Sequence, residues 1–150
     1  MNKSKTHYVL GFMFNKDKSK VALIKKNRPD WQRGKLNGIG GKIFSGGKDG
    51  YETAEQAMYR EFKEETGYPI FPMAWKFYAK MFNDDFQVDV FAAIGDLSIL
   101  ETMTDEKVVI LKVKDITKSR KKLISNLPWL IEMAIDFLNN GEFDMATVRY

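Results

Sequence analysis

Residues 52–68 read ETAEQAMYREFKEETGY, and the rest of the chain is interpreted from this stretch. No proline interrupts residues 53–66, most residues there are good helix formers, and Gly67 supplies the usual C-terminal stop. Apolar side chains recur at intervals of three and four, which predicts one face that packs on a core: Ala54, Ala57, Met58, Tyr59 and Phe62. The stretch therefore predicts an amphipathic helix.

The same helix concentrates negative charge. At about 100° per residue, Glu61, Glu64 and Glu65 fall within one sector of the helix surface. Like charges at this spacing destabilise a helix, so something must offset the repulsion. For three such glutamates alone, a solvated acidic face is the simplest interpretation, helped by Arg60 and Lys63. A hard divalent cation such as Mg²⁺ would offset the repulsion best.

The full pattern favours the cation. Gly46, Glu52 and residues 60–68 (REFKEETGY) fill every position of a motif with fixed spacing. The motif is glycine, five residues, glutamate, seven residues, Arg-Glu, an apolar residue, any residue, Glu-Glu, any residue, glycine and an apolar residue. This pattern resembles the Nudix box. The resemblance implies one Nudix hydrolase domain over residues 1–150, of the α/β (α+β) class, with a mixed β-sheet sandwiched between helices.

A second segment, residues 30–43 (DWQRGKLNGIGGKI), is similar to the segment before the Nudix helix in MutT-type oxidised-purine nucleoside triphosphatases. Glycines there let the backbone approach a phosphate and turn a carbonyl toward a metal. Residues 44–50 (FSGGKDG) then intervene before Glu52. Gly46 fits the motif by count, but the local sequence favours Gly41 as the equivalent glycine, with an insertion behind it. Phe44 replaces the usual acidic residue, which leaves the number of metals open.

The resemblance implies Mg²⁺-dependent hydrolysis of a nucleoside diphosphate linked to another moiety, with Mn²⁺ as an alternative metal. The first choice is a (d)NTP or an oxidised purine NTP, cleaved to NMP and pyrophosphate. Glu61, Glu64, Glu65 and the Gly41 carbonyl would hold the metals, and Arg60 would pair with Glu52. The general base would be a glutamate of the box, Glu61 or Glu64, or else Glu106 from a later acidic loop.

Substrate contacts are expected from basic and amide side chains. Lys42 and either Arg28 or Arg33 would meet phosphate. Asn37 stands where the oxidised-purine enzymes keep a base-reading asparagine, and an amide offers both a donor and an acceptor to a purine edge. Asn126 is a candidate second base reader, with helix capping as the alternative that the pattern favours.

Two other functions stay open. The substrate could be ADP-ribose, a dinucleoside polyphosphate or a nucleotide sugar. The protein could also be a non-catalytic Nudix-fold nucleotide sensor, although a sensor has no need of three mutually repelling glutamates.

Elsewhere the patterns predict further elements. Strands are expected at residues 6–14, 21–25, 73–82, 86–94 and 107–113, and the glycine-rich residues 36–43 form a short segment. A second helix is expected to open at residues 126–128, with Asn126 as its N-cap, and to end at residues 140–141. Residues 142–150 add a possible last strand.

Composition narrows the function classes. The chain has 150 residues, no cysteine, one histidine (His7) and a net charge of +4, which excludes disulfides, thiol catalysis and multi-histidine metal sites. No apolar run is long enough to span a membrane. The basic residues 115–122 lack interleaved aromatics, so no nucleic acid is expected. We therefore expect a cytoplasmic enzyme with a small nucleotide substrate and no membrane partner; its oligomeric state is open.

Overall fold

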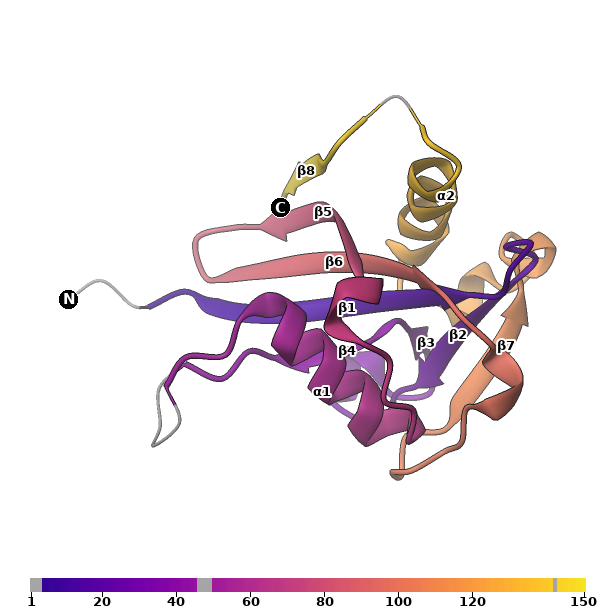
Figure 1. Ribbon diagram of the computed structural model, residues 1–150, viewed down its shortest axis with the longest axis horizontal. Coiled ribbons are helices and arrows are strands. Elements are labelled where there is room, and N and C mark those ends of the chain that lie inside the picture. Colours follow the sequence, from indigo (N-terminus) through magenta and orange to yellow (C-terminus); the bar gives the residue numbers. More distant parts are fainter. Residues whose placement is uncertain (1–3, 46–49, 142) are drawn as a thin grey trace.

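The computed structural model describes residues 4–45, 50–141 and 143–150, and it has a helix on each face of a β-sheet (Figure 1). The two helices are α1 (Ala54–Thr66) and α2 (Leu127–Leu138). The strands are β1 (Thr6–Phe14), β2 (Lys20–Lys25), β3 (Leu36–Asn37), β4 (Ile39–Lys42), β5 (Lys76–Phe82), β6 (Phe86–Ile94), β7 (Val108–Lys112) and β8 (Ala146–Arg149). This arrangement confirms the predicted α+β class and the sandwich of a sheet between helices.

The sheet is mixed, with β1 at its centre. Its strand order is β3-β2-β1-β6-β5-β8, while β4 also pairs with β1 and β7 with β2. β1 runs parallel to β6 and β5 runs parallel to β8, whereas the other pairs are antiparallel. The parallel β5–β8 pair brings the segment after α2 back to the sheet.

Alternation along β1 divides the core between the two faces. Val9 and Met13 pack in the cluster beneath α1, while Leu10, Phe12 and Phe14 pack in the cluster beneath α2. Successive strand residues point to opposite faces, so a strand buried on both sides is apolar almost throughout. The predicted buried strand at residues 6–14 is confirmed.

Helix α1 has the boundaries that its sequence predicts. The Thr53 side chain accepts a hydrogen bond from the Gln56 backbone, and the Gln56 side chain accepts one from the Thr53 backbone, which completes a capping box. The helix ends at Gly67, whose φ of 75° lies in the left-handed region that favours glycine. Met58 and Phe62 are buried against the sheet, while Glu61 and Glu65 are half-buried beside this face and Glu64 is exposed.

Two predictions about local structure were wrong. The expected strand at residues 73–82 begins only at Lys76, because the prolines before it favour a 3₁₀ turn at Pro72–Ala74. Asn126 does occupy the N-cap position of α2, but the expected side-chain cap is wrong, since its backbone is already helical and its amide donates to Tyr150 instead. Pro128 does lie in the first turn of α2, as predicted.

The remaining elements follow the sequence closely. The tail forms β8, and the glycine-rich segment forms β3 and β4, one on each side of Gly38. The expected insertion at residues 44–50 falls largely on residues 46–49, which lie outside the described residues. Within the described part of the chain, neither helix has the length and apolar character needed to cross a membrane.

Candidate active site

The acidic face of α1 lies against the glycine-rich strand β4. A Cβ added to Gly41 would overlap the carboxylate of Glu61, so any larger residue there would have to displace this side chain from its present position. β4 is fixed in this position by antiparallel pairing with β1, where Gly41 lies opposite Val9. The two segments that resemble the family motif are therefore in direct contact.

Arg60 is the centre of an ion-pair network on this face. Its Nε and Nη2 donate to the two carboxylate oxygens of Glu52 at 2.7 and 2.9 Å, in the bidentate geometry that favours arginine. Its Nη1 donates to Glu61 Oε1 at 2.8 Å and to Glu64 Oε2 at 3.3 Å. Its Nη2 also donates to the carbonyl oxygen of Lys42 at 3.0 Å, which ties α1 to the end of β4.

Glu52 forms hydrogen bonds with the opposite end of the segment that precedes α1. Its Oε1 accepts a hydrogen bond from the Phe44 backbone at 3.1 Å, and its own backbone N–H donates to the Phe44 carbonyl oxygen at 3.2 Å. Phe44 also lies under the Arg60 guanidinium, 4.0 Å from ring centroid to Cζ. The two ends of the inserted segment are thus joined, so that Glu52 reaches Arg60 despite the extra residues.

The pKa values of the carboxylates on this face are shifted in different directions. The Arg60 guanidinium lowers the pKa of Glu52, and Glu52 in turn raises the pKa of Arg60. Burial raises the pKa of Glu61 by more than its bonds to Arg60 lower it. Burial likewise raises the pKa of Glu65, although the Thr104 hydroxyl donates to Glu65 Oε2 at 2.8 Å. At these two half-buried glutamates the cost of burial therefore outweighs the hydrogen bonds that favour the charged form.

Glu106 lies in the loop before β7 and is almost fully buried. Its Oε1 accepts from Lys26 Nζ at 2.8 Å, and its Oε2 accepts from the Asn27 backbone at 2.6 Å. Burial alone would raise the pKa of Glu106, but these hydrogen bonds and the Lys26 charge lower it below the usual value. Thr104 connects this loop to α1, because its hydroxyl donates to Glu65 Oε2 at 2.8 Å and accepts from the Glu106 backbone N–H at 3.1 Å.

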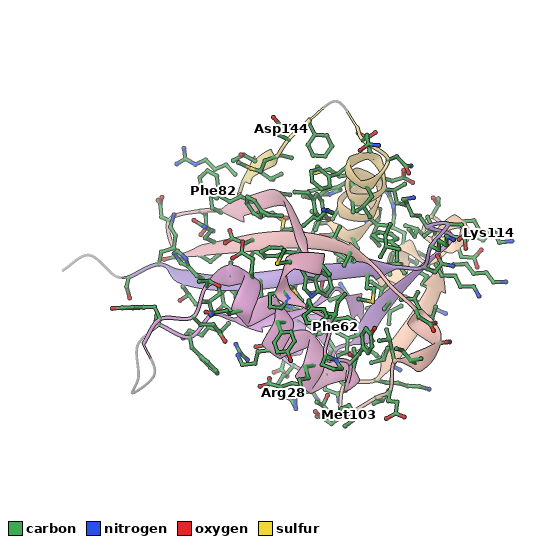
Figure 2. All side chains as sticks on the ribbon, viewed as in Figure 1. Arg28, Phe62, Phe82, Met103, Lys114 and Asp144 are labelled. Carbon is green, nitrogen blue, oxygen red and sulfur yellow. The ribbon has the colours of Figure 1, made fainter. Side chains whose placement is uncertain are left out.

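The predicted phosphate-binding residues lie in different environments. Arg28 Nη2 pairs with Asp105 Oδ2 at 2.6 Å, next to Glu106 in the same loop, and Figure 2 labels Arg28 at the lower edge of the molecule. Arg33 pairs with Asp30 on the exposed surface. Lys42 is exposed at the end of β4, and its carbonyl oxygen is bound by Arg60. Sequence reasoning missed Lys26, because its partner Glu106 is 80 residues away.

A pocket of about 740 Å³ opens beside this face. Its lining comes from β1, β3, β4, β5, β6, the loop after β2, the loop before α2 and the residue after β8, and includes both Gly41 and the two predicted base readers. Its polar lining includes Lys26, Gln32, Asn37, Asp85, Ser125 and Asn126, and its aromatic lining includes Tyr8, Trp31, Phe86 and Tyr150. A mostly apolar cleft with a few convergent polar groups is typical of a small-molecule site.

The two asparagines in the pocket have different hydrogen bonds. Asn37 Nδ2 donates to Gln32 Oε1 at 3.1 Å, and Asn37 Oδ1 accepts from the Gly38 backbone at 2.8 Å. Asn126 Nδ2 donates to the Tyr150 hydroxyl at 3.0 Å, while Asn126 Oδ1 is buried and has no protein partner. Sequence reasoning missed Gln32 and Tyr150, and no local pattern in the sequence singles either of them out.

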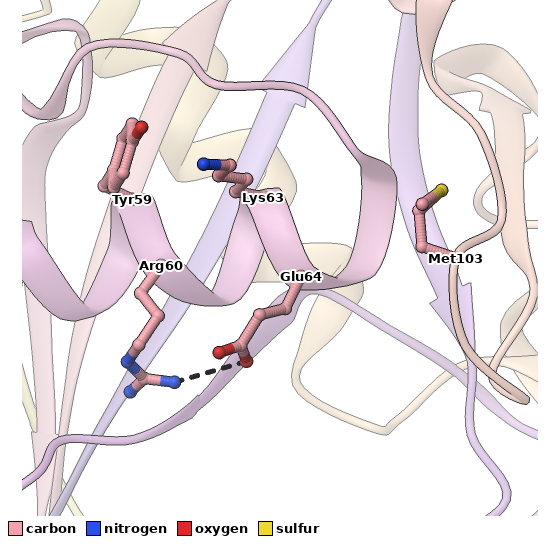
Figure 3. Close-up of a pocket in the computed structure, with 5 residues that line it drawn as sticks. All are labelled: Tyr59, Arg60, Lys63, Glu64 and Met103. Carbon is pink, nitrogen blue, oxygen red and sulfur yellow. Dashed lines mark hydrogen bonds and ion pairs between the residues drawn. The ribbon is translucent and has the colours of Figure 1, made fainter.

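A second hollow of about 470 Å³ lies on the outer face of α1 (Figure 3). It is lined by Tyr59, Arg60, Lys63, Glu64 and Met103. Figure 3 shows Glu64 and Arg60 paired on this face, and the Glu64 side chain is 57% exposed. Glu64 lines this hollow, whereas Gly41 and both predicted base readers line the larger pocket.

The donor set suits a hard cation. Glu61, Glu64 and Glu65 offer only oxygen atoms, which Mg²⁺ and Mn²⁺ prefer, and the Gly41 backbone lies against one of these carboxylates. In the described residues no three acidic or histidine side chains converge closely enough to ligate one ion as they stand. The reason is visible in the contacts, because Arg60 binds Glu61 and Glu64 while Thr104 binds Glu65.

The fold has close relatives among solved structures. A MutT structure from a study of Aliivibrio salmonicida and Vibrio cholerae superposes with a TM-score of 0.70 at 24% identity, covering 89% of this chain and all of that one. A Nudix hydrolase from Nitrosomonas europaea has a TM-score of 0.71 at 18% identity, covering 100% of this chain and 82% of that one. A Nudix-family hydrolase from Clostridium perfringens has a TM-score of 0.67 at 18% identity, covering 91% and 99%. The fold is therefore that of the Nudix hydrolases.

Residues 5–124 match the NUDIX domain, and the chain belongs to this family. It is a Nudix pyrophosphohydrolase with a MutT-like fold, and enzymes of this family generally use divalent metal ions. The predicted family and enzyme class are confirmed. No curated protein matches the chain.

Proposed function

We propose that this enzyme hydrolyses a nucleoside triphosphate to a nucleoside monophosphate and pyrophosphate, with oxidised purine (d)NTPs as its first substrates. The observation that carries the proposal is the single pocket lined both by Gly41, which adjoins the Glu61 carboxylate, and by two amide side chains. A triphosphate directed toward α1 would leave its base near Asn37 and Asn126. We place the activity in one domain, residues 1–150, in the cytoplasm, with no nucleic acid partner.

The cation would be Mg²⁺, with Mn²⁺ as an alternative, held by Glu61, Glu64, Glu65 and the Gly41 carbonyl. When bound, it supplies charge neutralisation for phosphate oxygens and makes water more acidic. Burial of Glu61 and Glu65 supports this assignment, because both side chains are held in surroundings that penalise an uncompensated negative charge. Arg60 would keep its bidentate contact with Glu52 and give up its weaker one with Glu64, at 3.3 Å.

The proton acceptor is assigned to a box glutamate, Glu61 or Glu64. Glu106 remains the alternative, but three N–H donors and a lowered pKa make its carboxylate a weak base. We assign Glu106 instead to holding Lys26, which lines the pocket and can meet a phosphate with its ammonium. Lys42 and Arg28 are the other phosphate candidates; Arg33 is a poorer one, since it pairs with Asp30 on the surface.

The base would lie among the aromatic rings of the pocket. Tyr8 and Phe86 line it together with Trp31, whose side chain is largely exposed and free to stack on a ligand. Asn37 and Asn126 would read the base edge, as their amides combine donors and acceptors. Gln32 fixes the Asn37 amide in one orientation.

A substrate panel tests the proposal. Purine and pyrimidine NTPs, their oxidised forms, ADP-ribose, a dinucleoside polyphosphate and a nucleotide sugar would be incubated with Mg²⁺, Mn²⁺ or a chelator. Release of pyrophosphate and NMP from purine NTPs, abolished by the chelator, is the expected result. If ADP-ribose or a nucleotide sugar is cleaved faster than the purine NTPs, the enzyme belongs to that substrate class instead. Binding without turnover of any substrate would identify a sensor.

A further inference from the structure

The loop before β7 is attached to the C-terminal end of α1 by its backbone. The last carbonyl groups of a helix have no partner within the helix, and this loop supplies donors to two of them. The Glu101 N–H donates to the Thr66 carbonyl oxygen at 3.0 Å, and the Met103 N–H donates to the Glu65 carbonyl oxygen at 3.2 Å. Thr104 follows these two contacts and is thereby placed beside the Glu65 side chain.

The two hydrogen bonds of the Thr104 hydroxyl have defined directions. A backbone N–H can only donate, so the hydroxyl oxygen accepts from the Glu106 N–H at 3.1 Å. An ionised carboxylate can only accept, so the hydroxyl donates its proton to Glu65 Oε2 at 2.8 Å. The other acceptor within reach is the Glu106 carbonyl oxygen at 3.5 Å, where a hydrogen bond is weak. The hydroxyl proton therefore points to Glu65.

This contact leaves the second carboxylate oxygen of Glu65 available. Among the residues that the structure describes, none donates a hydrogen bond to Glu65 Oε1, and the side chain is half-buried. A carboxylate that ligates a metal is itself usually hydrogen-bonded by a neighbouring group, which fixes its orientation. The Thr104 hydroxyl suits this role, because it immobilises one oxygen of Glu65 and leaves the other for a cation.

From these contacts we propose that Thr104 is a positioning residue of the cation site, which holds Glu65 through Oε2 so that Oε1 can bind the divalent cation. The same hydroxyl accepts from Glu106, whose carboxylate binds Lys26 of the pocket at 2.8 Å. Thr104 therefore fixes the cation site relative to this lysine as well. The inference rests on the proposed function, because it takes Glu65 as a metal ligand. Thr104 itself touches neither the cation nor the substrate.

The test measures cation binding in the absence of substrate. Free Mn²⁺ would be counted by electron paramagnetic resonance during titration of the wild type, Thr104→Val, Thr104→Ser and Thr102→Val. Valine has the shape of threonine without the hydroxyl, so Thr104→Val should weaken Mn²⁺ binding by about tenfold or more, the usual effect of removing a hydrogen bond to a metal-ligating group. Thr104→Ser keeps the hydroxyl and should restore most of the affinity.

Thr102→Val is the matched control. Thr102 lies in the same loop, and its hydroxyl also accepts from a backbone N–H, that of Val108 at 3.0 Å. In the described part of the chain this hydroxyl makes no hydrogen bond to α1. The two valine variants therefore lose the same kind of loop hydrogen bond, and their melting temperatures should fall alike. Only Thr104→Val should lose affinity for Mn²⁺.

Two further measurements separate positioning from a general weakening of the loop. In the metal-free protein, the ¹³C resonance of the Glu65 carboxylate should move in Thr104→Val and stay in place in Thr102→Val. In turnover assays, Thr104→Val should raise the Mg²⁺ concentration that gives half-maximal activity, whereas kcat at saturating Mg²⁺ should change much less.

Four results would overturn the proposal: no Mn²⁺ binding by the wild type, unchanged affinity in Thr104→Val, tighter binding in that variant, or an equal loss in Thr102→Val. Tighter binding would mean that the hydroxyl competes with the cation for Glu65. An enzyme that hydrolyses NTPs but binds Mn²⁺ equally well with valine at this position would retain the proposed function and lose this inference. A protein in which Thr104→Val weakens Mn²⁺ binding but which hydrolyses no NTP would do the reverse.

Discussion

The face of α1 and the base pocket are built in opposite ways. On α1, Glu61, Glu64 and Arg60 lie within five consecutive residues, and the helix itself places them together. In the pocket, Asn37, Asn126 and Tyr150 come from three distant parts of the chain and meet only through the sheet. The acidic face therefore depends on local helix geometry, whereas the pocket depends on long-range contacts such as the pairing of β5 with β8.

The largest expected effect is on α1. Replacing the Glu61 carboxylate by Gln keeps its shape but removes a charge from the cation site, so Mg²⁺-dependent turnover should fall by more than about 100-fold. The fold should persist, because burial already disfavours the charged form of Glu61. Removing this charge also relieves repulsion between neighbouring glutamates of the helix, which does not destabilise it. Steady-state pyrophosphate release and a thermal melt measure the two effects.

Glu55→Gln is the control for this change, since Glu55 is exposed in the first turn of the same helix. It should leave turnover unchanged. If Glu61→Gln retains turnover within about threefold of the wild type, the assignment of the cation to this face is wrong.

A smaller effect on activity is expected from a substitution in the pocket where the base is proposed to bind. Asn37→Ala should lower kcat/KM for the preferred purine nucleotide by about 1–3 kcal/mol, the penalty for an unpaired polar partner. A base-free triphosphate never uses this contact and should lose nothing. Asn139→Ala, on the exposed end of α2, is the matched control.

The selectivity of this loss is what distinguishes the two regions. If Asn37 acts mainly by orienting the glycine segment through its bond to the Gly38 backbone, every substrate will be affected alike. Equal losses for purine, pyrimidine and base-free substrates would then argue against purine recognition and leave the broader pyrophosphohydrolase class in place.

The same contrast explains what could be predicted from the sequence. The limits of α1 were predictable because the Thr53–Gln56 capping box and Gly67 are local signals. The approach of Gly41 to Glu61 could be inferred only from the family resemblance. The bond between Asn126 and Tyr150 could not be foreseen, since it depends on strand pairing that leaves no periodic trace in the sequence. For the same reason the Asn126 side chain was wrongly expected to cap α2, although Asn126 does occupy the N-cap position.

The smallest effect concerns the junction between the two regions, where Lys26 joins the Glu106 loop to the pocket. The pKa of Glu106 is lower in the folded protein than the reference value of 4.5, so the unfolded chain binds its proton more readily. Stability from this group is therefore complete above about pH 4.5 and is lost as the pH falls through the folded-state pKa.

Glu106→Gln cannot titrate, and its stability deficit should be about 1–2 kcal/mol at neutral pH and shrink on acidification. Urea unfolding of both proteins between pH 7 and pH 3 measures the deficit, with Glu101→Gln from the exposed part of the same loop as control. A deficit that stays constant over this range would mean that Glu106 stabilises the loop by packing rather than by its charge, and that Lys26 is not held in the pocket by an ion pair.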